Sequence, residues 1–424
     1  MKALLTLAAR SAWHRRFGLA LVVACVALAT LLLWGVERVR HDARAGFSNA
    51  VSGTDLVVGA RGGSVQLMLY AVFRIGSATN TIRWRSVQAL AADPAVAWVV
   101  PISLGDSHRG YPVVGTDGGY FRHFRYGEQR PLALREGRAF VDGPAGVFEA
   151  VLGAEVAARL GYGLGHALVL AHGSGEFSAN DHADKPFTVV GVLAPTGTPV
   201  DRSVHISLAG MQAIHLDWIA GAPLPGMAVP ADRVHEHDLT PRQVTAALVG
   251  LKSRAAVFSV QRRIAEFSEE PLMAVLPGVA LDELWQAVGL GERALLAMAA
   301  LVALVSLAGL VAVVVTGLEQ RRRELAVLRA VGAGPRTVFA LLVTEGLLVT
   351  AAGAALGALI ASAAVALGAD AVQAHFGLTL SSGWPTMVQW QWLGAVLAAG
   401  TLASVLPGWR AYRLSLAEGL MPRA

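Results

Sequence analysis

Residues 294–318 read ALLAMAALVALVSLAGLVAVVVTGL, with no charged side chain between Arg293 and Glu319. A helix needs roughly 20 apolar residues to cross the hydrocarbon core of a bilayer. Stretches that span lipid must be helical, because lipid offers no partner to backbone N–H and C=O groups. Comparable stretches occur at 17–36, 337–369 and 387–409. The sequence therefore predicts an α-helical membrane protein with four transmembrane helices.

The composition supports this class and excludes others. Of the 424 residues, 54% are hydrophobic and only 15% are charged, whereas a soluble domain has about 25% charged residues. The single cysteine, Cys25, excludes an intramolecular disulfide framework and a cysteine-based zinc site. The net charge is +5, yet there are only three lysines and no dense basic run with interleaved aromatic residues. We therefore expect no nucleic-acid partner.

Lysine and arginine positions predict the orientation of the spans. They gather in the N-terminal segment, in the loop 319–336 and in the tail, and the loop 370–386 has none. By the positive-inside rule, both termini and the loop 319–336 are cytoplasmic. The first stretch is predicted to be an uncleaved anchor rather than a signal peptide, because its apolar run is long and no small-x-small site follows it.

These observations predict an ordered set of segments. The predicted order is a cytoplasmic amphipathic segment (1–16), transmembrane helix 1 (17–36), a periplasmic α+β domain with a helical stalk (37–293), transmembrane helix 2 (294–318), a cytoplasmic coupling-helix loop (319–336), transmembrane helix 3 (337–369), a periplasmic loop (370–386), transmembrane helix 4 (387–409) and a cytoplasmic tail (410–424).

The long segment between the first two spans mixes strand and helix patterns. Residues 187–193 and 204–208 contain β-branched runs that predict strands. Residues 154–160 predict a short helix that ends near Gly161. This alternation is typical of an α+β domain.

Histidines interleave with carboxylates in the same segment, and imidazole and carboxylate groups are ligands of Zn²⁺. The candidate metal ligands are His172, His182, Asp184, His235 and His237. The last two histidines lack the His-Glu-x-x-His spacing of a metalloprotease. Three interpretations stay open at this point: ordinary surface histidines, a metal-related role, and a membrane-anchored metalloenzyme.

Residues 319–333 read EQRRRELAVLRAVGA between the second and third spans. Leu325, Leu328 and Val331 fall at helical spacing, which predicts an apolar stripe on a charged helix. Such a helix docks in a groove of a partner protein or, alternatively, lies on the anionic membrane surface with no partner.

This motif resembles the cytoplasmic signature of FtsX/MacB-type ABC transporter permeases. The sequence TEGLL at 344–348, followed by Gly353 and Gly357, and the tail at 407–420 are also similar to that family. Residues 152–160 and 187–193 resemble the MacB-type periplasmic core. The resemblance implies a type VII permease with the MacB-type core between helices 1 and 2.

The resemblance also implies roles for individual residues. Residues expected to couple the chain to an ATPase are Glu319, Arg321, Arg322, Arg323, Glu324, Leu325, Leu328, Arg329 and Gly332. Glu345, Gly353 and Gly357 are expected to act in coupling or packing within the membrane. A small-residue face of this kind allows close helix packing.

No P-loop pattern occurs, since the only lysine followed by Ser or Thr is Lys252, which follows Leu251. The layout thus resembles split-chain members such as LolC and LolE, in which ATP and Mg²⁺ bind a separate ATPase subunit. We expect no enzymatic activity and no cofactor in this chain.

The function that the resemblance implies is mechanotransmission in the bacterial inner membrane. ATP hydrolysis by the partner would drive movement of the periplasmic domain, for export or extraction of a lipoprotein, a peptide or another amphiphile. Expected partners are the ATPase, a second permease copy or paralogue, a periplasmic protein and membrane lipids. The alternatives are an FtsX-like regulator of a periplasmic hydrolase and a component of zinc handling.

Overall fold

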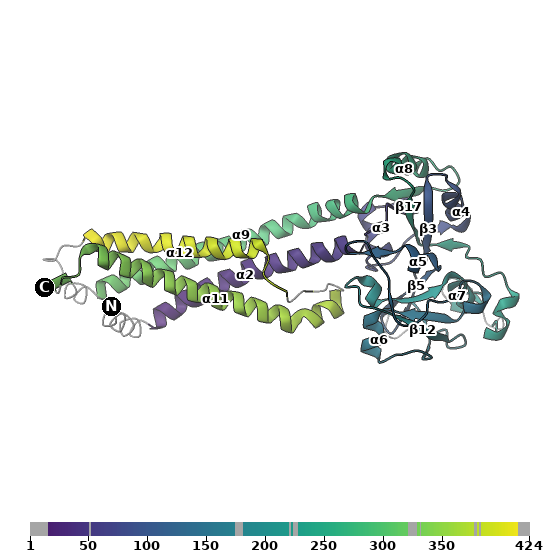
Figure 1. The fold of residues 1–424 in the computed structure, drawn as a ribbon, viewed down its shortest axis with the longest axis horizontal. Helices are drawn as coiled ribbons and strands as arrows, with labels where there is room; N and C mark the ends of the chain where they lie inside the picture. Colours follow the sequence, from purple (N-terminus) through teal and green to yellow (C-terminus); the bar gives the residue numbers. More distant parts are fainter. Residues whose placement is uncertain are drawn as a thin grey trace. The chain divides into compact units, whose positions relative to one another are not determined.

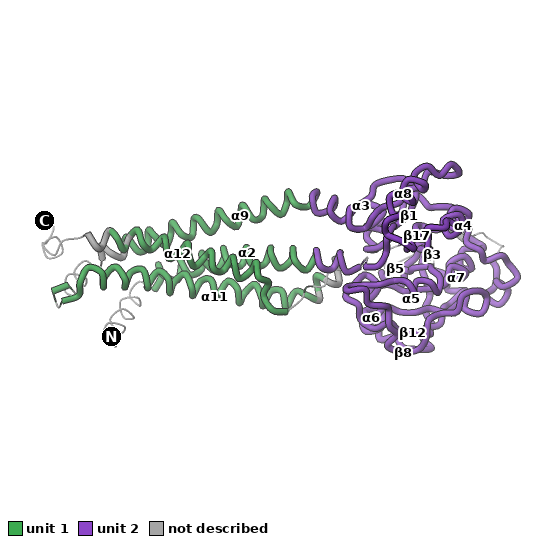
Figure 2. The backbone as a smooth tube through the Cα atoms, turned by 45° about the horizontal axis from the view of Figure 1, so that its top comes forward, with its two compact units in different colours: residues 1–43, 288–424 green, residues 44–287 purple. Residues whose placement is uncertain are grey.

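The structure is a computed structural model in which two compact units are distinguished (Figure 2). It describes residues 16–50, 52–173, 181–219, 222–223, 228–320, 329–330, 332–376, 380 and 383–413. The helical unit comprises residues up to 43 and from 288 onward, and the α+β unit comprises residues 44–287. Two helices, α2 (Arg16–Asn49) and α9 (Pro277–Gln320), contribute residues to both units without a break.

The helical unit is built from long apolar helices. Besides α2 and α9 it contains α11 (Pro335–Phe376) and α12 (Met387–Arg413). By length and composition, three helices in the described part of the chain are able to cross a membrane: 16–49, 277–316 and 335–369. This confirms the membrane class. The fourth predicted stretch forms α12, and the count of four spans stays a prediction.

The four helices pack along one another in this unit (Figure 1). Their common core takes side chains from every helix, as expected for a helix bundle. The buried or partly buried core residues include Val26 of α2, Leu310 of α9, Leu342 of α11 and Val396 of α12.

In the α+β unit, the first sheet is antiparallel with four strands. Their order is β18 (Leu272–Val275), β1 (Leu56–Ala60), β17 (Ala246–Leu251) and β3 (Val96–Ile102). Alternate residues of β1 face opposite sides, as the pleat requires. Leu56 and Val58 pack with helices α4 (Trp84–Ala92) and α8 (Val257–Ala265), whereas Val57 packs with α3 (Ser64–Ala71).

The second sheet has eight strands and mixed pairing. Their order is β10 (Ala167–Leu168), β12 (Phe187–Leu193), β9 (Glu149–Leu152), β13 (Val204–Ser207), β5 (Tyr111–Thr116), β4 (Asp106–His108) and β11 (Ala171–His172), with β8 (Leu134–Gly137) paired to β12. Helices α6 (Ala154–Leu160) and α7 (Leu208–Ile214) pack on one face. Residues of both sheets, including Leu248 and Val151, share a core on their other faces.

Short elements complete the α+β unit. They are α5 (Gly119–His123), the strand pairs β2 (Ile82–Arg83) with β16 (Gln243–Val244), β6 (Arg125–Tyr126) with β7 (Arg130–Pro131) and β14 (Trp218–Ile219) with β15 (Ala222–Pro223), and the 3₁₀ turns η1 (Pro144–Gly146), η2 (Pro199–Arg202), η3 (Ala231–Glu236) and η4 (Arg254–Ala256).

The predicted α+β class is confirmed. The predicted strand 187–193 is β12 and the predicted helix 154–160 is α6. Gly161 ends α6 in the left-handed region with φ of 67°, which glycine adopts without steric cost. The predicted strand at 204–208 is one residue shorter, because Leu208 begins α7 with the Ser207 hydroxyl as its N-cap.

Candidate functional site

Three histidines and one aspartate meet at the edge of the second sheet that β11 forms. Asp106 lies on β4, and His172 lies opposite it on β11 as its register partner. His215 is the C-terminal capping residue of α7. His182 is held by its backbone N–H, which donates to Leu170 O at 2.8 Å. Residues from four separate segments thus converge on one point.

One carboxylate oxygen is central to this cluster. Asp106 Oδ1 lies 3.1 Å from His172 Nδ1, 3.5 Å from His215 Nε2 and 3.9 Å from His182 Nε2. His215 Nε2 is also 3.3 Å from His172 Nδ1. One potential ligand atom from each residue can be chosen so that all four lie within 4.8 Å of one another. The four residues form what we call the Asp106–His cluster.

The cluster is largely removed from solvent. The side chains of His182 and Asp106 are 0% and 1% exposed, and that of His172 is 38% exposed. The ring of Trp218 lies over His182 with 4.2 Å between centroids. Neither ring nitrogen of His182, nor Asp106 Oδ2, has a hydrogen-bond partner among the described residues. Such buried polar atoms are rare in native proteins.

The charges of the cluster are coupled. Burial disfavours ionisation of Asp106, but the neighbouring imidazoles, first among them His172 with its contact at 3.1 Å, outweigh it and hold the pKa of the carboxyl well below its usual range. Burial also opposes a charge on His215. The neighbouring Asp106 carboxylate outweighs that burial and raises the pKa of the imidazole. The negative charge at this place is therefore stable across the physiological range.

A buried ion pair adjoins the cluster and ties two of its segments together. Lys185 Nζ lies 2.9 Å from both carboxylate oxygens of Asp217 and 2.8 Å from Asp184 Oδ2. Lys185 N donates to His182 O at 3.1 Å, and Asp217 follows His215 by two residues. The pair thus holds the turn that carries His182 against the turn that carries His215.

The structure brings together only part of the predicted ligand set. His172 and His182 are in the cluster, and Asp184 instead pairs with Lys185. His235 and His237 are exposed at η3, where His237 Nδ1 lies 3.3 Å from Arg233 O. The sequence prediction lacked Asp106 and His215. His215 shares its residue type with the predicted ligands, but no local signal marks Asp106.

The predicted coupling motif falls largely outside the described residues. Arg321, Arg322, Arg323, Glu324, Leu325 and Leu328 all lie there, and Glu319 is described only as part of helix α9. Arg329 and Gly332 are described. Gly332 N donates to Arg329 O at 3.1 Å, and the φ of Gly332 is 102°. α11 begins three residues later, at Pro335.

The predicted intramembrane residues lie on α11. Glu345 is partly buried there. Gly353 and Gly357 face α2: a Cβ on Gly353 would lie 2.7 Å from Val26 Cβ, and one on Gly357 would lie 2.8 Å from Thr30 Cβ. Real side chains do not approach so closely, so the contact between these helices needs glycine at both positions.

The ends of α2 and α9 are fixed in the core of the α+β unit. Phe47 of α2 lies 5.6 Å from the ring of Trp285 of α9 and 4.2 Å from Phe73. Ala280 and Leu281 of α9 are buried in the same core. Aromatic pairs at such distances add stability beyond their buried area.

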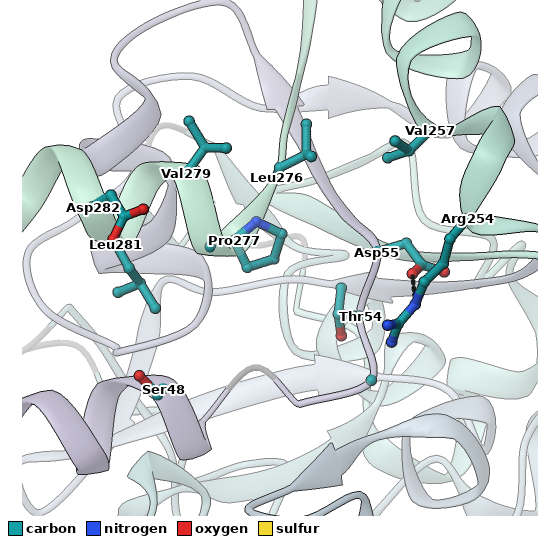
Figure 3. Close-up of a pocket in the computed structure, with 12 residues that line it drawn as sticks. Ser48, Thr54, Asp55, Arg254, Val257, Leu276, Pro277, Val279, Leu281 and Asp282 are labelled. Carbon is teal, nitrogen blue, oxygen red and sulfur yellow. Dashed lines mark ion pairs between the residues drawn. The ribbon is translucent and has the colours of Figure 1, made fainter.

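An open cleft of about 540 Å³ lies where these helices join the first sheet (Figure 3). Ser48 from α2 and Pro277 and Asp282 from α9 line it, together with the ion pair between Asp55 and Arg254. The Arg254 Nε to Asp55 Oδ1 distance is 3.4 Å, and the arginine is largely exposed. An exposed pair of this kind contributes little stability.

Comparison with known proteins now places the chain. A model of the MacB-like periplasmic core domain matches residues 17–267, which is more than half of the chain. A model of the FtsX-like permease C-terminal region matches residues 296–416. The chain belongs to the MacB/FtsX-like family of type VII ABC transporter permeases. It is accordingly a membrane protein with a periplasmic domain. It is one component of a transporter that acts with an ATPase.

Two solved structures resemble parts of this permease. The periplasmic region of MacB from Actinobacillus actinomycetemcomitans is 12% identical, covering 55% of this chain and 94% of that one, with a TM-score of 0.33. The extracellular domain of the ABC-type transporter YknZ from Gram-positive bacteria is 14% identical, covering 46% and 89% respectively, with a TM-score of 0.28. No curated protein matches the permease sequence significantly.

Proposed function

We propose that this permease converts ATP binding and hydrolysis by a separate ATPase subunit into movement of its periplasmic domain. The work done there is export or extraction of a lipoprotein, a peptide or another amphiphile. The observation that carries the proposal is the continuity of α2 and α9, which have 34 and 44 residues. At 1.5 Å per residue, α9 is about 66 Å long, about twice the thickness of the hydrocarbon core.

A continuous helix transmits displacement only if its far end is held. Phe47, Trp285 and Leu281 fasten the ends of α2 and α9 to the core of the α+β unit. Within the helical unit, the Arg40 guanidinium of α2 pairs with two carboxylates. Its Nη2 lies 2.9 Å from Oε1 of Glu37 on the same helix, and its Nη1 lies 3.2 Å from Oε1 of Glu292 on α9. These contacts support a paired stalk whose two helices move together. Nucleotide binding to the partner would then shift the population between two arrangements.

The membrane arrangement proposed here has four spans, with α12 as the fourth. Both termini and the loop 319–336 face the cytoplasm, and the chain lies in the bacterial inner membrane. The tight contact of Gly353 and Gly357 with α2 supports an ordered bundle. A second permease copy or paralogue completes the complex, and ATP with Mg²⁺ binds only the ATPase.

The segment 319–336 is the proposed contact with the ATPase. Its arginines and its apolar stripe at Leu325 and Leu328 suit a helix that docks in a groove. We expect Leu325→Asp, or reversal of the three charges at 321–323, to abolish stimulation of the co-expressed ATPase, because the apolar docking face or its flanking charges are lost. ATP turnover of the reconstituted complex measures this.

The matched control is Arg130→Glu, a charge reversal on the exposed strand β7. We expect normal insertion of all variants and normal stimulation in the control. Normal stimulation in Leu325→Asp and in the triple charge reversal would refute the docking helix. Loss of stimulation in Arg130→Glu as well would show a general effect of added negative charge.

A further inference from the structure

We infer that the Asp106–His cluster binds one divalent transition-metal cation of the Zn²⁺ class. The ligands are one carboxylate and three imidazoles, contributed by Asp106, His172, His182 and His215. The inference concerns the α+β unit alone and does not depend on the proposed coupling to an ATPase. Its basis is the spacing of the donor atoms, the lack of partners for buried polar atoms, and the contacts that orient the rings.

The donor spacing matches that of a tetrahedral site. With Zn²⁺–ligand distances of about 2.0–2.1 Å, neighbouring donors in a tetrahedron are about 3.3 Å apart. Asp106 Oδ1, His172 Nδ1 and His215 Nε2 are separated by 3.1, 3.3 and 3.5 Å. Three donors are therefore already at ligand spacing. The fourth donor, His182 Nε2, lies 3.9 Å from Asp106 Oδ1 and within 4.8 Å of the others, so its ring would move inward on binding.

The unpartnered buried atoms of the cluster indicate a binding site for a cation. His182 is fully buried, and both of its ring nitrogens lack a hydrogen-bond partner among the described residues. A buried polar group left in this state costs about 1–3 kcal/mol. Asp106 Oδ2 adds a third such atom in the same place. A cation would accept the lone pair of one His182 ring nitrogen and neutralise the buried carboxylate, which reduces this penalty.

The ring of His215 is oriented as a metal ligand. His215 Nδ1 lies 2.8 Å from Met211 O, so this nitrogen carries the proton and donates it to the carbonyl. The lone pair of Nε2 is then directed at the cluster. Metal-bound histidines usually have this arrangement, with the second ring nitrogen donating to a carbonyl or a carboxylate.

The surroundings specify the cation class and a route of access. Imidazole ligands favour Zn²⁺ and its neighbours in the transition series, whereas Mg²⁺ and Ca²⁺ prefer oxygen ligands only. His172 is the most exposed member of the cluster and would meet the incoming ion first. Four protein ligands leave no open position for a reacting water, as in structural zinc sites. The ion would thus clamp the β4–β11 edge to the end of α7 rather than perform catalysis.

Metal titration of the full-length permease tests the inference. The protein, without a polyhistidine tag, is stripped with a chelator in detergent and titrated with Zn²⁺ by calorimetry. We expect one saturable equivalent. We expect His172→Ala and His182→Ala each to weaken binding by at least about tenfold, in line with the loss of a well-placed group at a metal site. Co²⁺ bound in its place should give the intense visible absorption of tetrahedral coordination.

The chain offers a matched control in its exposed histidines. The double variant His235→Ala/His237→Ala removes two imidazoles outside the cluster and should bind Zn²⁺ as the wild type does. Because His172 is partly exposed, its alanine variant should retain the wild-type circular dichroism spectrum. The inference is overturned by any of three results: no saturable binding by the wild type, equal affinity of His172→Ala and the control, or equal affinity for Mg²⁺.

Discussion

Two buried polar groups lie side by side in the α+β unit and differ in how completely their atoms are partnered. Asp217 has Lys185 Nζ at 2.9 Å from both oxygens, and its Oδ2 also accepts the Val229 N–H at 3.0 Å. In the Asp106–His cluster, His182 has no hydrogen-bond partner among the described residues. The first group is fully paired, whereas the second keeps buried polar atoms that the described residues leave without a partner.

The difference shows how a stabilising contact can be distinguished from a binding site. Lys185 and Asp217 neutralise each other, and their task is to hold the neighbouring turns in register. In the cluster, one carboxylate faces three imidazoles, and His182 makes no hydrogen bond to it although its Nε2 lies 3.9 Å from Asp106 Oδ1. A buried charge that is paired with an opposite charge indicates a stabilising contact. Buried polar atoms that have no hydrogen-bond partner indicate a binding site for a ligand.

The largest expected effect comes from breaking the complete pair. Lys185→Met leaves the carboxylate of Asp217 buried without its cation, which costs about 3–5 kcal/mol. We expect the melting temperature of the α+β unit in the full-length permease to fall by roughly 10 °C. Thermal unfolding followed by intrinsic fluorescence measures this fall.

Lys252→Met is the matched control, because Lys252 is exposed and its Nζ donates to a backbone oxygen, Pro94 O, at 2.8 Å. This variant should unfold within about a degree of the wild type. Equal melting temperatures for the two methionine variants would show that the buried pair contributes nothing. A positioning role for the pair also predicts weaker Zn²⁺ binding by Lys185→Met at a temperature where it is still folded.

Local patterns predict the long elements of this fold well. The β-branched run of β12 and the amphipathic turn of α6 with its terminal Gly161 carry their own signals. The two-residue strands β10, β11 and β14 carry none, because tertiary pairing alone defines them. The helices α2 and α9 also extend beyond the predicted spans, since polar residues continue the helix after the apolar run ends.

The candidate site was only half predictable for the same reason. Asp106 and His172 become neighbours through the pairing of β4 with β11, which joins segments more than 60 residues apart. Residue type pointed to His172 and His182 but equally to His235 and His237, which are exposed. The density of histidines along the chain therefore says less about a metal site than does the burial that the fold imposes.

A third buried group, His205, shows what a histidine does without a carboxylate. It is fully buried beside Tyr120, with 5.2 Å between ring centroids, and its Nδ1 lies 3.3 Å from Val151 O. Burial lowers the pKa of His205 to about 3. In the unfolded chain a histidine has a pKa of about 6.5. Below that pH the unfolded state binds a proton that the folded state does not.

The contribution of neutral His205 to the free energy of unfolding is therefore fully present above pH 6.5 and is lost as the pH falls towards 3. Between pH 7 and pH 4.5 the loss is about 2–3 kcal/mol. We expect His205→Gln to reduce the fall in melting temperature between these two pH values, measured with a chelator present to keep the cluster metal-free. His166→Gln, at an exposed histidine, should retain the full fall. Identical falls in His205→Gln and the wild type would contradict the assignment.

The smallest effect is expected at Asp117, a carboxylate whose charged neighbours are Asp142 and, with a weaker opposing effect, Arg122. Burial, and then the negative charge of Asp142, raise the pKa of Asp117 to about 6. The folded state thus holds a proton more tightly than the unfolded chain, in which the pKa is about 3.9. Its contribution to stability is present below pH 4 and is lost as the pH rises through 6.

Asp117→Asn removes that ionisation. The Gly119 N–H, which donates to Asp117 Oδ1 at 2.9 Å in the wild type, can still donate to the amide oxygen of the asparagine. The variant should be more stable by about 1 kcal/mol at pH 7.5, less than the full shift implies because the site is partly exposed. At pH 4 the gain should vanish. Asp232→Asn, an exposed site on η3, should show no gain at either pH. A gain that persists at pH 4 would mean that Asp117→Asn stabilises the fold through packing and not through the lost ionisation. The raised pKa of Asp117 would then contribute nothing to stability, and only the lowered pKa of Asp106 beside its histidines would remain of the comparison.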